Sequence, residues 1–338
     1  MKTTIFSRLI SKGIAAMTIA ASVTPLISCD RLREDLRECD RGARIRFVYD
    51  YNMEFANAFP SQVDCLTVLF YDEEGHYVTT RTNMTSDLQD ENWRMVVDLD
   101  PGTYNIIAYG GMECENSSFS FTSIPSNIQM QDIEVELKPS CLTSPDGTEL
   151  HDLFYGRADI SIEDADMTYR DVTVYMMKDT NNLRILLQNV DGTPIDEADF
   201  DFKITDDNTL MAWNNDVIPT QTVDYLPWAH GTSAVGERPE DGEDVTVAYA
   251  EFSFPRLVTN NSPRLIITRK TDGQKVIDIP LINYLALLKS EKYASMSTQE
   301  FLDRESRWKM LFFLQGGIWL DTVIEINDWI VRINNADL

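Results

Sequence analysis

The stretch 93-WRMVVDLDPGTYNIIA-108 decides the fold of this chain. Apolar side chains occupy every second position from Trp93 to Leu99, and the pattern resumes from Tyr104 to Ala108. A period of two residues is that of a half-buried β-strand. Asp100-Pro101-Gly102 lies between the two runs and combines residues that are typical of turns. The stretch therefore predicts two short strands joined by a tight turn.

The same period recurs along most of the chain, with turn residues between the runs. Strands of this length that follow one another with little intervening helix favour antiparallel β-sandwiches and disfavour a parallel βαβ sheet. The sequence therefore predicts an all-β fold. The runs are 44–51, 66–70, 133–137, 172–176, 183–187, 200–204, 245–254 and 264–270, and three apolar-rich candidates at 309–315, 318–327 and 329–333 close the chain.

One helix is expected late in the chain. Ser297 and Glu300 have the spacing of a capping box, and Phe301 and Leu302 follow as apolar positions. The segment 281–288 fits either a short helix or a strand end.

A break in the pattern at 138–150 suggests where the chain divides. It contains Pro139, Pro145, Asp146 and Gly147 and has no apolar period. Such composition is typical of a linker. We therefore expect two tandem sandwiches, one over 44–140 and one over 150–338, with the short helix in the second.

Length and charge exclude several function classes. The chain has 338 residues, of which 43% are hydrophobic, so it can bury a substantial core. Asp plus Glu number 55 against 29 Lys plus Arg, a net charge of −26. This excess of negative charge repels a phosphate backbone and an anionic membrane surface. We expect no nucleic-acid partner and no membrane attachment through a basic patch.

The first residues have the features of a bacterial export signal. Three cations precede an apolar segment over 13–26, which is too short for a mature spanning helix. Leu26-Ile27-Ser28-Cys29 then resembles a lipobox, in which the peptide is cut before the cysteine and the cysteine is acylated. We expect 1–28 to be a lipoprotein signal peptide, Cys29 to carry the lipid, palmitate among its acyl chains, and 29–43 to be a charged tether. A plain signal peptide followed by a chance cysteine is the alternative.

The other cysteines point to disulfides. An even number of cysteines in an exported chain favours disulfide bonds, and four of them allow three pairings. Free buried thiols are the alternative. No two cysteines have the close spacing of a thiolate zinc site. The candidates are Cys39, Cys65, Cys114 and Cys141.

The sequence contains no recognisable catalytic motif. A nucleophile elbow, a P-loop, a dinucleotide-binding glycine motif and a zinc-protease motif are all missing from it. His76, His151 and His230 lie far apart and are interpreted as single surface histidines. The acidic run 196–207 lacks calcium-loop spacing, and Phe200 and Phe202 alternate through it, so it predicts a strand with an acidic outer face. We expect no enzyme activity, no metal and no cofactor.

Several segments in fixed order resemble a known family. They are Phe47–Met53, Ala56–Asp64, Leu69–Gly75, Asp100–Tyr104, Ala108–Gly111, Leu153–Gly156 and Gln299–Arg304. Together with Cys29 they make the chain similar to the FimB-type fimbrial anchor proteins over nearly its whole length.

The resemblance implies a specific role. Members are outer-membrane lipoproteins of Bacteroides-group bacteria, surface-exposed, with two transthyretin-like β-sandwich domains. They anchor a fimbrial (pilus) shaft at its base and influence its length, and shaft subunits join by β-strand donation. The implied partners are a shaft subunit and, through Cys29, the outer membrane. The strands 44–51 and 329–333 are candidates for the shaft contact, or they are ordinary core strands, and the donor or acceptor role stays open.

A surface glycan-binding lipoprotein is the alternative. It is suggested by Trp213, Tyr225 and Trp228, whose rings could stack on a sugar.

Overall fold

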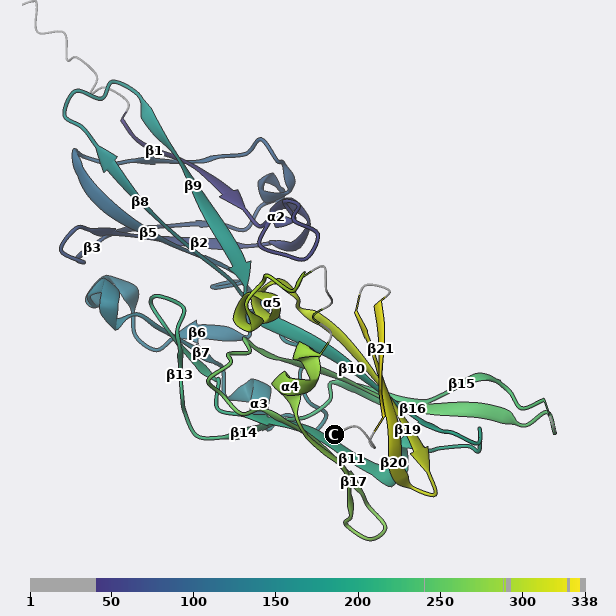
Figure 1. Ribbon diagram of the computed structural model, residues 1–338. Coiled ribbons are helices and arrows are strands. Elements are labelled where there is room, and N and C mark those ends of the chain that lie inside the picture. Colours follow the sequence, from purple (N-terminus) through teal and green to yellow (C-terminus); the bar gives the residue numbers. More distant parts are fainter. Residues whose placement is uncertain (1–40, 240, 288, 290–292, 327–328, 335–338) are drawn as a thin grey trace, which may run out of the picture.

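A computed structural model describes residues 41–239, 241–287, 289, 293–326 and 329–334. Strands dominate this part of the chain, and they form two sandwich-like bodies arranged end to end (Figure 1). The expected all-β fold with tandem sandwiches is confirmed. Among the described residues, none of the helices combines the length and the apolar character that crossing a bilayer requires.

The first body is one seven-stranded sheet in the order β3-β2-β5-β8-β9-β1-β4. All its pairs are antiparallel except β1 with β9, which run parallel. One core collects buried side chains from six of the strands, so the sheet folds over upon itself. The strands are β1 (Gly42–Val48), β2 (Leu66–Asp72), β3 (Tyr77–Asn83), β4 (Met95–Asp98), β5 (Gly102–Gly110), β8 (Phe154–Ile162) and β9 (Tyr169–Lys178).

The turn at residues 100–102 joins β4 and β5, and these two strands do not pair with each other. In the described chain β4 pairs with β1, whereas β5 pairs with β2 and β8. Apolar residues on both strands, Met95 and Val97 on β4 and Tyr104 and Ile106 on β5, still enter the same core. The turn therefore takes the chain from one layer of the first body to the other.

The second body combines three sheets around a larger core. A six-stranded sheet has the order β15-β16-β10-β19-β20-β21, and two four-stranded sheets have the orders β14-β11-β17-β18 and β13-β12-β7-β6. The strands are β6 (Phe119–Phe121), β7 (Glu134–Leu137), β10 (Thr180–Asn189), β11 (Phe200–Asp206), β12 (Leu210–Ala212), β13 (Val217–Ile218), β14 (Val223–Tyr225), β15 (Ala229–Glu237), β16 (Asp244–Pro255), β17 (Arg264–Arg269), β18 (Lys275–Pro280), β19 (Arg307–Gln315), β20 (Ile318–Ile326) and β21 (Trp329–Asn334).

The expected helix is present as α5 (Thr298–Arg304). The Ser297 side chain accepts a hydrogen bond from the Glu300 amide at 3.0 Å, which is the predicted cap, and Phe301 and Leu302 are buried. The ambiguous segment 281–288 begins with a helix, α4 (Leu281–Ala286). The remaining α-helices are α2 (Phe59–Gln62) and α3 (Ser140–Thr143), and short 3₁₀ turns are η1 (Ser86–Gln89), η2 (Pro125–Asn127), η3 (Met130–Asp132) and η4 (Glu197–Asp199).

The strand pairing does not follow the expected division into 44–140 and 150–338. β8 and β9 come after the break and nevertheless belong to the first body. β7 comes before it and pairs with β12 of the second body. The break at 138–150 contains α3 and returns the chain to the first body. The sequence pattern does not predict this return, because a loss of apolar period marks a connection without saying which sheet it leads to.

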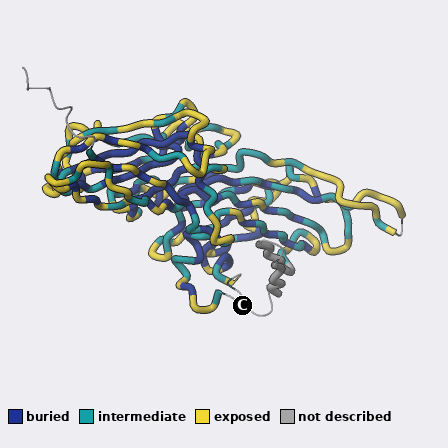
Figure 2. The backbone as a smooth tube through the Cα atoms, turned by 90° about the horizontal axis from the view of Figure 1, so that it is seen from above, coloured by how far each residue is buried: buried dark blue, intermediate teal, exposed yellow. Residues whose placement is uncertain are grey.

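The two bodies share apolar packing. The outer face of β2 and β5 contributes Tyr71 and Tyr109 to the same core that holds Phe119 of β6 and Leu183 of β10. In Figure 2, buried positions occupy the strands of both bodies and the region where they meet. The final crossing is direct, since β9 ends at Lys178 and β10 begins at Thr180. A single residue, Asp179, separates the strands of the two bodies.

Candidate functional site

The crossing from β9 to β10 is held by buried polar contacts. The Lys178 ammonium lies 2.6 Å from an Asp152 carboxylate oxygen, and the lysine side chain is 1% exposed. The Thr180 hydroxyl donates to the other oxygen of Asp152 at 2.8 Å. The backbone amide of Asp179 donates to the Leu153 carbonyl at 2.7 Å. The start of β8 is thus fixed to the strand that enters the second body.

Asp179 itself is fully buried at this junction. Asn215 donates to one carboxylate oxygen at 2.9 Å, and the other oxygen has no hydrogen-bond partner among the described residues. Burial disfavours the anion and raises the pKa of Asp179 to about 7, although the nearby Arg256 cation acts in the opposite direction.

Arg256 organises the second-body side of the junction. Its guanidinium makes two hydrogen bonds to the buried Asp303 carboxylate, at 2.9 and 3.0 Å, and a third to the Asn215 carbonyl at 2.6 Å. Gln299 donates to the same carboxylate at 2.9 Å. Asp303 lies on α5, so the pair joins this helix to the end of β16.

Helix α5 also contacts the first body. The Arg304 guanidinium lies 4.0 Å from the ring centroid of Tyr51 and 4.8 Å from that of Phe55. Cations over aromatic faces at this distance are attracted by the ring quadrupole. The junction therefore combines buried ion pairs with a helix that contacts both bodies.

We expect Asp179→Asn to reduce the pH dependence of stability. Between about pH 4 and 7 the folded state keeps a proton that the unfolded state releases, so the free energy of unfolding falls as pH rises and levels off above the folded pKa. At about 1.4 kcal/mol per unit of pKa shift, the full effect is up to about 4 kcal/mol. Urea unfolding at pH 5 and pH 8 measures it.

The variant should gain stability relative to the natural chain at pH 8. Asp206 and Glu305, whose pKa values burial also raises, remain in it and leave part of the slope. Asp201→Asn on an exposed position is the matched control. An unchanged pH slope in Asp179→Asn would contradict the assignment.

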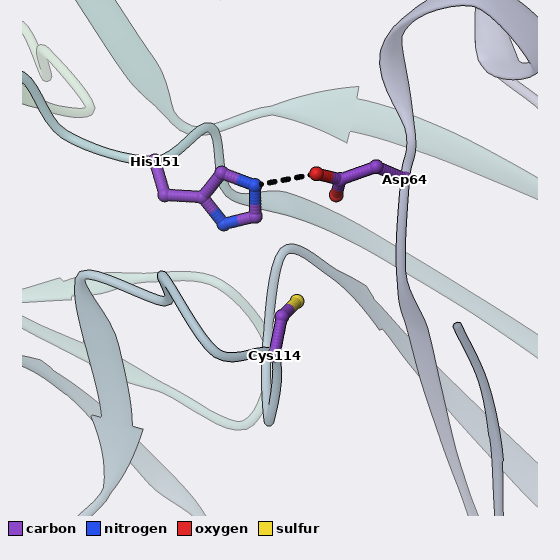
Figure 3. A group of neighbouring side chains, drawn as sticks. All are labelled: Asp64, Cys114 and His151. Atoms are coloured by element: carbon purple, nitrogen blue, oxygen red, sulfur yellow. Dashed lines mark hydrogen bonds and ion pairs between the residues drawn. The ribbon is translucent and has the colours of Figure 1, made fainter. Parts of the chain in front are cut away.

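A second cluster lies beside the junction (Figure 3). His151 Nε2 lies 2.9 Å from an Asp64 carboxylate oxygen, and one ligand atom from each of Asp64, Cys114 and His151 falls within 4.8 Å of the others. Cys114 is bonded to Cys65, so its sulfur is no thiolate ligand. The cluster therefore connects the β7–β8 connection to the α2–β2 loop and does not form a metal site.

The cysteine predictions have mixed outcomes. Cys65 and Cys114 form a disulfide with their Cα atoms 6.2 Å apart. Cys141 has no disulfide partner among the described residues, is partly buried, and donates its thiol to the Ser118 carbonyl at 3.8 Å, so the expected second disulfide stays a prediction. Cys29 and Cys39 lie outside the described residues.

The three histidines all lie beside carboxylates. The side chains of His76 and His230 are 61% and 41% exposed, as expected for surface residues, and they contact Asp72 and Glu197. The His151 side chain is only 20% exposed and belongs to the cluster of Figure 3, so its surface interpretation is wrong. The acidic run contains the predicted strand, β11, with Phe200 and Phe202 buried and Asp201 exposed between them. The run differs from the prediction in that it begins with the turn η4 and that Asp206 is buried.

The aromatic residues proposed for glycan stacking do not form an open platform. Tyr225 is 4% exposed, and its hydroxyl donates to Asn208 in the core. Trp213 is covered by the Arg157 guanidinium at 4.8 Å, and the ring nitrogen of Trp228 is shielded from solvent.

The junction residues themselves were not anticipated from the sequence. The only available signal was Lys178-Asp179-Thr180, a charged pair between two apolar alternations with neither Gly nor Pro. Arg256 and Asp303 gave no such signal, because they are 47 residues apart and meet only in the fold.

A family model and solved structures from Bacteroides match this chain over most of its length. The model of the family described as fimbrillin-A associated anchor proteins Mfa1 and Mfa2 matches residues 36–335. A Bacteroides thetaiotaomicron structure named as a candidate adhesin is 49% identical with a TM-score of 0.82, over 89% of this chain and 100% of that one. A second structure from that organism, named as a candidate polysaccharide-binding protein, is 29% identical with a TM-score of 0.73 over the same shares.

A more distant structure has the same fold. It is the fimbrial anchor protein Mfa2 from Porphyromonas gingivalis, 17% identical with a TM-score of 0.64, over 87% of this chain and 99% of that one. No protein of curated function matches the sequence. The matched family consists of structural proteins and is not an enzyme family. Membership gives this chain a fimbrium-associated role at the cell surface. The chain belongs to the family of fimbrillin-A associated anchor proteins.

Proposed function

We propose that this chain is an outer-membrane lipoprotein that anchors a fimbrial shaft to the cell surface through β-strand complementation with a shaft subunit. The family match over residues 36–335 carries the proposal. The lipobox-like Leu26–Cys29 and the charged segment that follows supply the attachment. An anchor that occupies the end of a shaft also limits further growth at that end, which would influence shaft length.

Of the two candidate contact strands, the last is better suited to the role. β1 lies inside its sheet, paired with β9 over seven residues and with β4 on its other side. β21 lies at the edge of the six-stranded sheet and pairs with β20 alone among the described strands. A strand with one free edge still has backbone groups to offer a partner. We assign the shaft contact to β21.

The positions of β1 and β21 also separate the two attachments. β1 runs parallel to β9, with Gly42 opposite Tyr169, and β9 reaches the junction at its other end, Lys178. The chain therefore enters the first body at the end away from the second body. A lipid at Cys29 and a shaft contact at β21 would therefore be attached to different bodies of the molecule.

Removal of β21 tests the shaft contact. We expect a chain that stops at Asp328 to remain on the cell surface and to lose most of the co-purifying shaft subunit after mild detergent extraction, because the strand that carries the assigned contact is missing. A chain that lacks only residues 335–338 is the matched control, since these residues follow β21. Thermal unfolding checks that the shorter chain folds. Equal recovery of shaft subunit with both chains would contradict the assignment.

Surface glycan binding is the second candidate. One observation favours it, the 29% identical structure named as a candidate polysaccharide-binding protein. Because Tyr225 is buried, such binding would need a site other than the three aromatic residues.

A further inference from the structure

An open pocket lies where the two bodies meet. Its volume is about 570 Å³, within the range of roughly 300–1,000 Å³ that is usual for small-ligand sites. The first body contributes the α2–β2 loop and Gln89 at the end of η1. The second contributes Asn182 near the start of β10 and Arg307 at the start of β19. A ligand here would contact both bodies at once.

One wall of the pocket is rigid. Asp152 is held by Lys178 and Thr180, as described above, and His151 is held by Asp64 through Nε2 (Figure 3). The backbone amide of His151 also donates to the Ser118 hydroxyl at 2.8 Å. Side chains fixed in this way need little reorganisation when a ligand binds, which favours affinity.

The amide and guanidinium groups of the lining are free to bind a ligand. Four lining residues carry amide side chains, and none of these amides makes a hydrogen bond to another described residue. The Arg307 guanidinium likewise has no hydrogen-bond or ion-pair partner in the described chain. The oxygen of the Asn182 amide is shielded from solvent and unpaired, so a small turn of this amide toward a ligand would recover a lost hydrogen bond. The four amides are Gln62, Gln89, Asn116 and Asn182.

The charges of the lining limit what can bind. Three carboxylates, Asp64, Glu149 and Asp152, face two cations, Lys178 and Arg307. The carboxylates of Asp64 and Asp152 are committed to His151 and Lys178, which leaves no cluster of free anions for a cation. A polyanion such as a phosphate ester would meet a net negative wall. Most of the lining is polar, so a lipid chain would remove water from these groups without replacing the lost hydrogen bonds.

We propose that this junction pocket binds a neutral sugar unit of a cell-surface or extracellular glycan. Each amide offers a donor and an acceptor side by side, which matches neighbouring hydroxyl groups of a sugar ring, and Arg307 adds donors in a fixed plane. No Phe, Tyr or Trp is among the lining residues, so recognition depends on hydrogen bonds. The site is independent of the lipid anchor and of the shaft contact at β21.

Saturation-transfer NMR on the full mature protein in detergent micelles tests the proposal. The probes are the methyl glycosides of glucose, galactose, mannose and N-acetylglucosamine, together with glucuronate and inorganic phosphate. We expect transfer to at least one neutral glycoside. Transfer to none of the four, or preferential binding of glucuronate or phosphate, would overturn the proposal.

Substitutions locate the site. Asn182→Ala and Arg307→Ala are each expected to weaken binding about tenfold, which corresponds to ~1.4 kcal/mol. Gln221→Ala, an exposed amide that is not among the pocket residues, is the matched control and should bind like the natural chain. Unfolding curves check that the variants are folded, and Gln89→Ala on the exposed rim replaces any that is not. Unchanged affinity in the folded pocket variants would show that the sugar binds elsewhere and would refute the assignment.

Discussion

Replacement of Cys29 by alanine is expected to move nearly all of the protein from the membrane fraction into the culture medium. Each buried CH₂ of an acyl chain contributes roughly 0.8 kcal/mol to membrane binding, so two or more chains hold a protein stably and their loss removes that contribution. The net charge of −26 also opposes adsorption to anionic lipid. Cell fractionation followed by immunoblotting measures the result.

The fimbrial shaft should follow its anchor. If the shaft is attached through this protein, the Cys29→Ala strain should shed whole shafts into the medium with the variant still bound to them. Cys39→Ala is the control, because it removes a neighbouring cysteine outside the lipobox. Membrane retention of Cys29→Ala would refute lipid anchoring. Release of the protein without the shafts would refute the anchoring role and would still support lipid attachment at Cys29.

Local sequence patterns predicted the faces of the strands well. The alternation on β4 and β11 identified which side chains enter a core, because a strand must turn every second side chain to the same face. The Ser297 cap could also be predicted, because a capping box, like the alternation of a strand, involves only residues that are close together in the sequence.

Strand partners could not be predicted in this way. The parallel pairs β1–β9 and β10–β19 each join segments more than a hundred residues apart. A period of two residues specifies a buried face and carries no information about the neighbouring strand. For this reason the division at 138–150 was misplaced, and the turn at Asp100–Gly102 connects strands that do not pair with each other.

The candidate site was hidden for a related reason. Arg256, Asp303 and Asp179 are charged residues, and in isolation a charged residue is interpreted as solvent-exposed. Asp179 and Asp303 are buried and Arg256 is partly buried, because three separate segments meet at the junction and satisfy one another there. Composition predicted that disulfides are present, since oxidised pairs are expected in exported chains, but it could not predict that Cys65 pairs with Cys114.

Arg256→Ala is expected to destabilise the protein by about 3–5 kcal/mol, because removal of one partner leaves the buried Asp303 carboxylate without its cation. The Asn215 carbonyl loses a donor at the same time. Urea unfolding at fixed pH measures the change. Arg184→Ala is the matched control, since the 53% exposed Arg184 pairs with Glu251 at the surface and should cost less than about 1 kcal/mol.

The loss should also depend on pH. Arg256 lowers the pKa of the buried Asp179, so without this cation the folded-state pKa of Asp179 rises further. An acid whose folded pKa is raised destabilises the protein once pH exceeds its unfolded pKa, and the penalty grows up to the folded pKa. Arg256→Ala should therefore be more harmful at pH 8 than at pH 5, and the double variant with Asp179→Asn should lose that difference. A cost equal to that of Arg184→Ala at both pH values would mean that the Arg256–Asp303 pair contributes nothing to the stability of the fold.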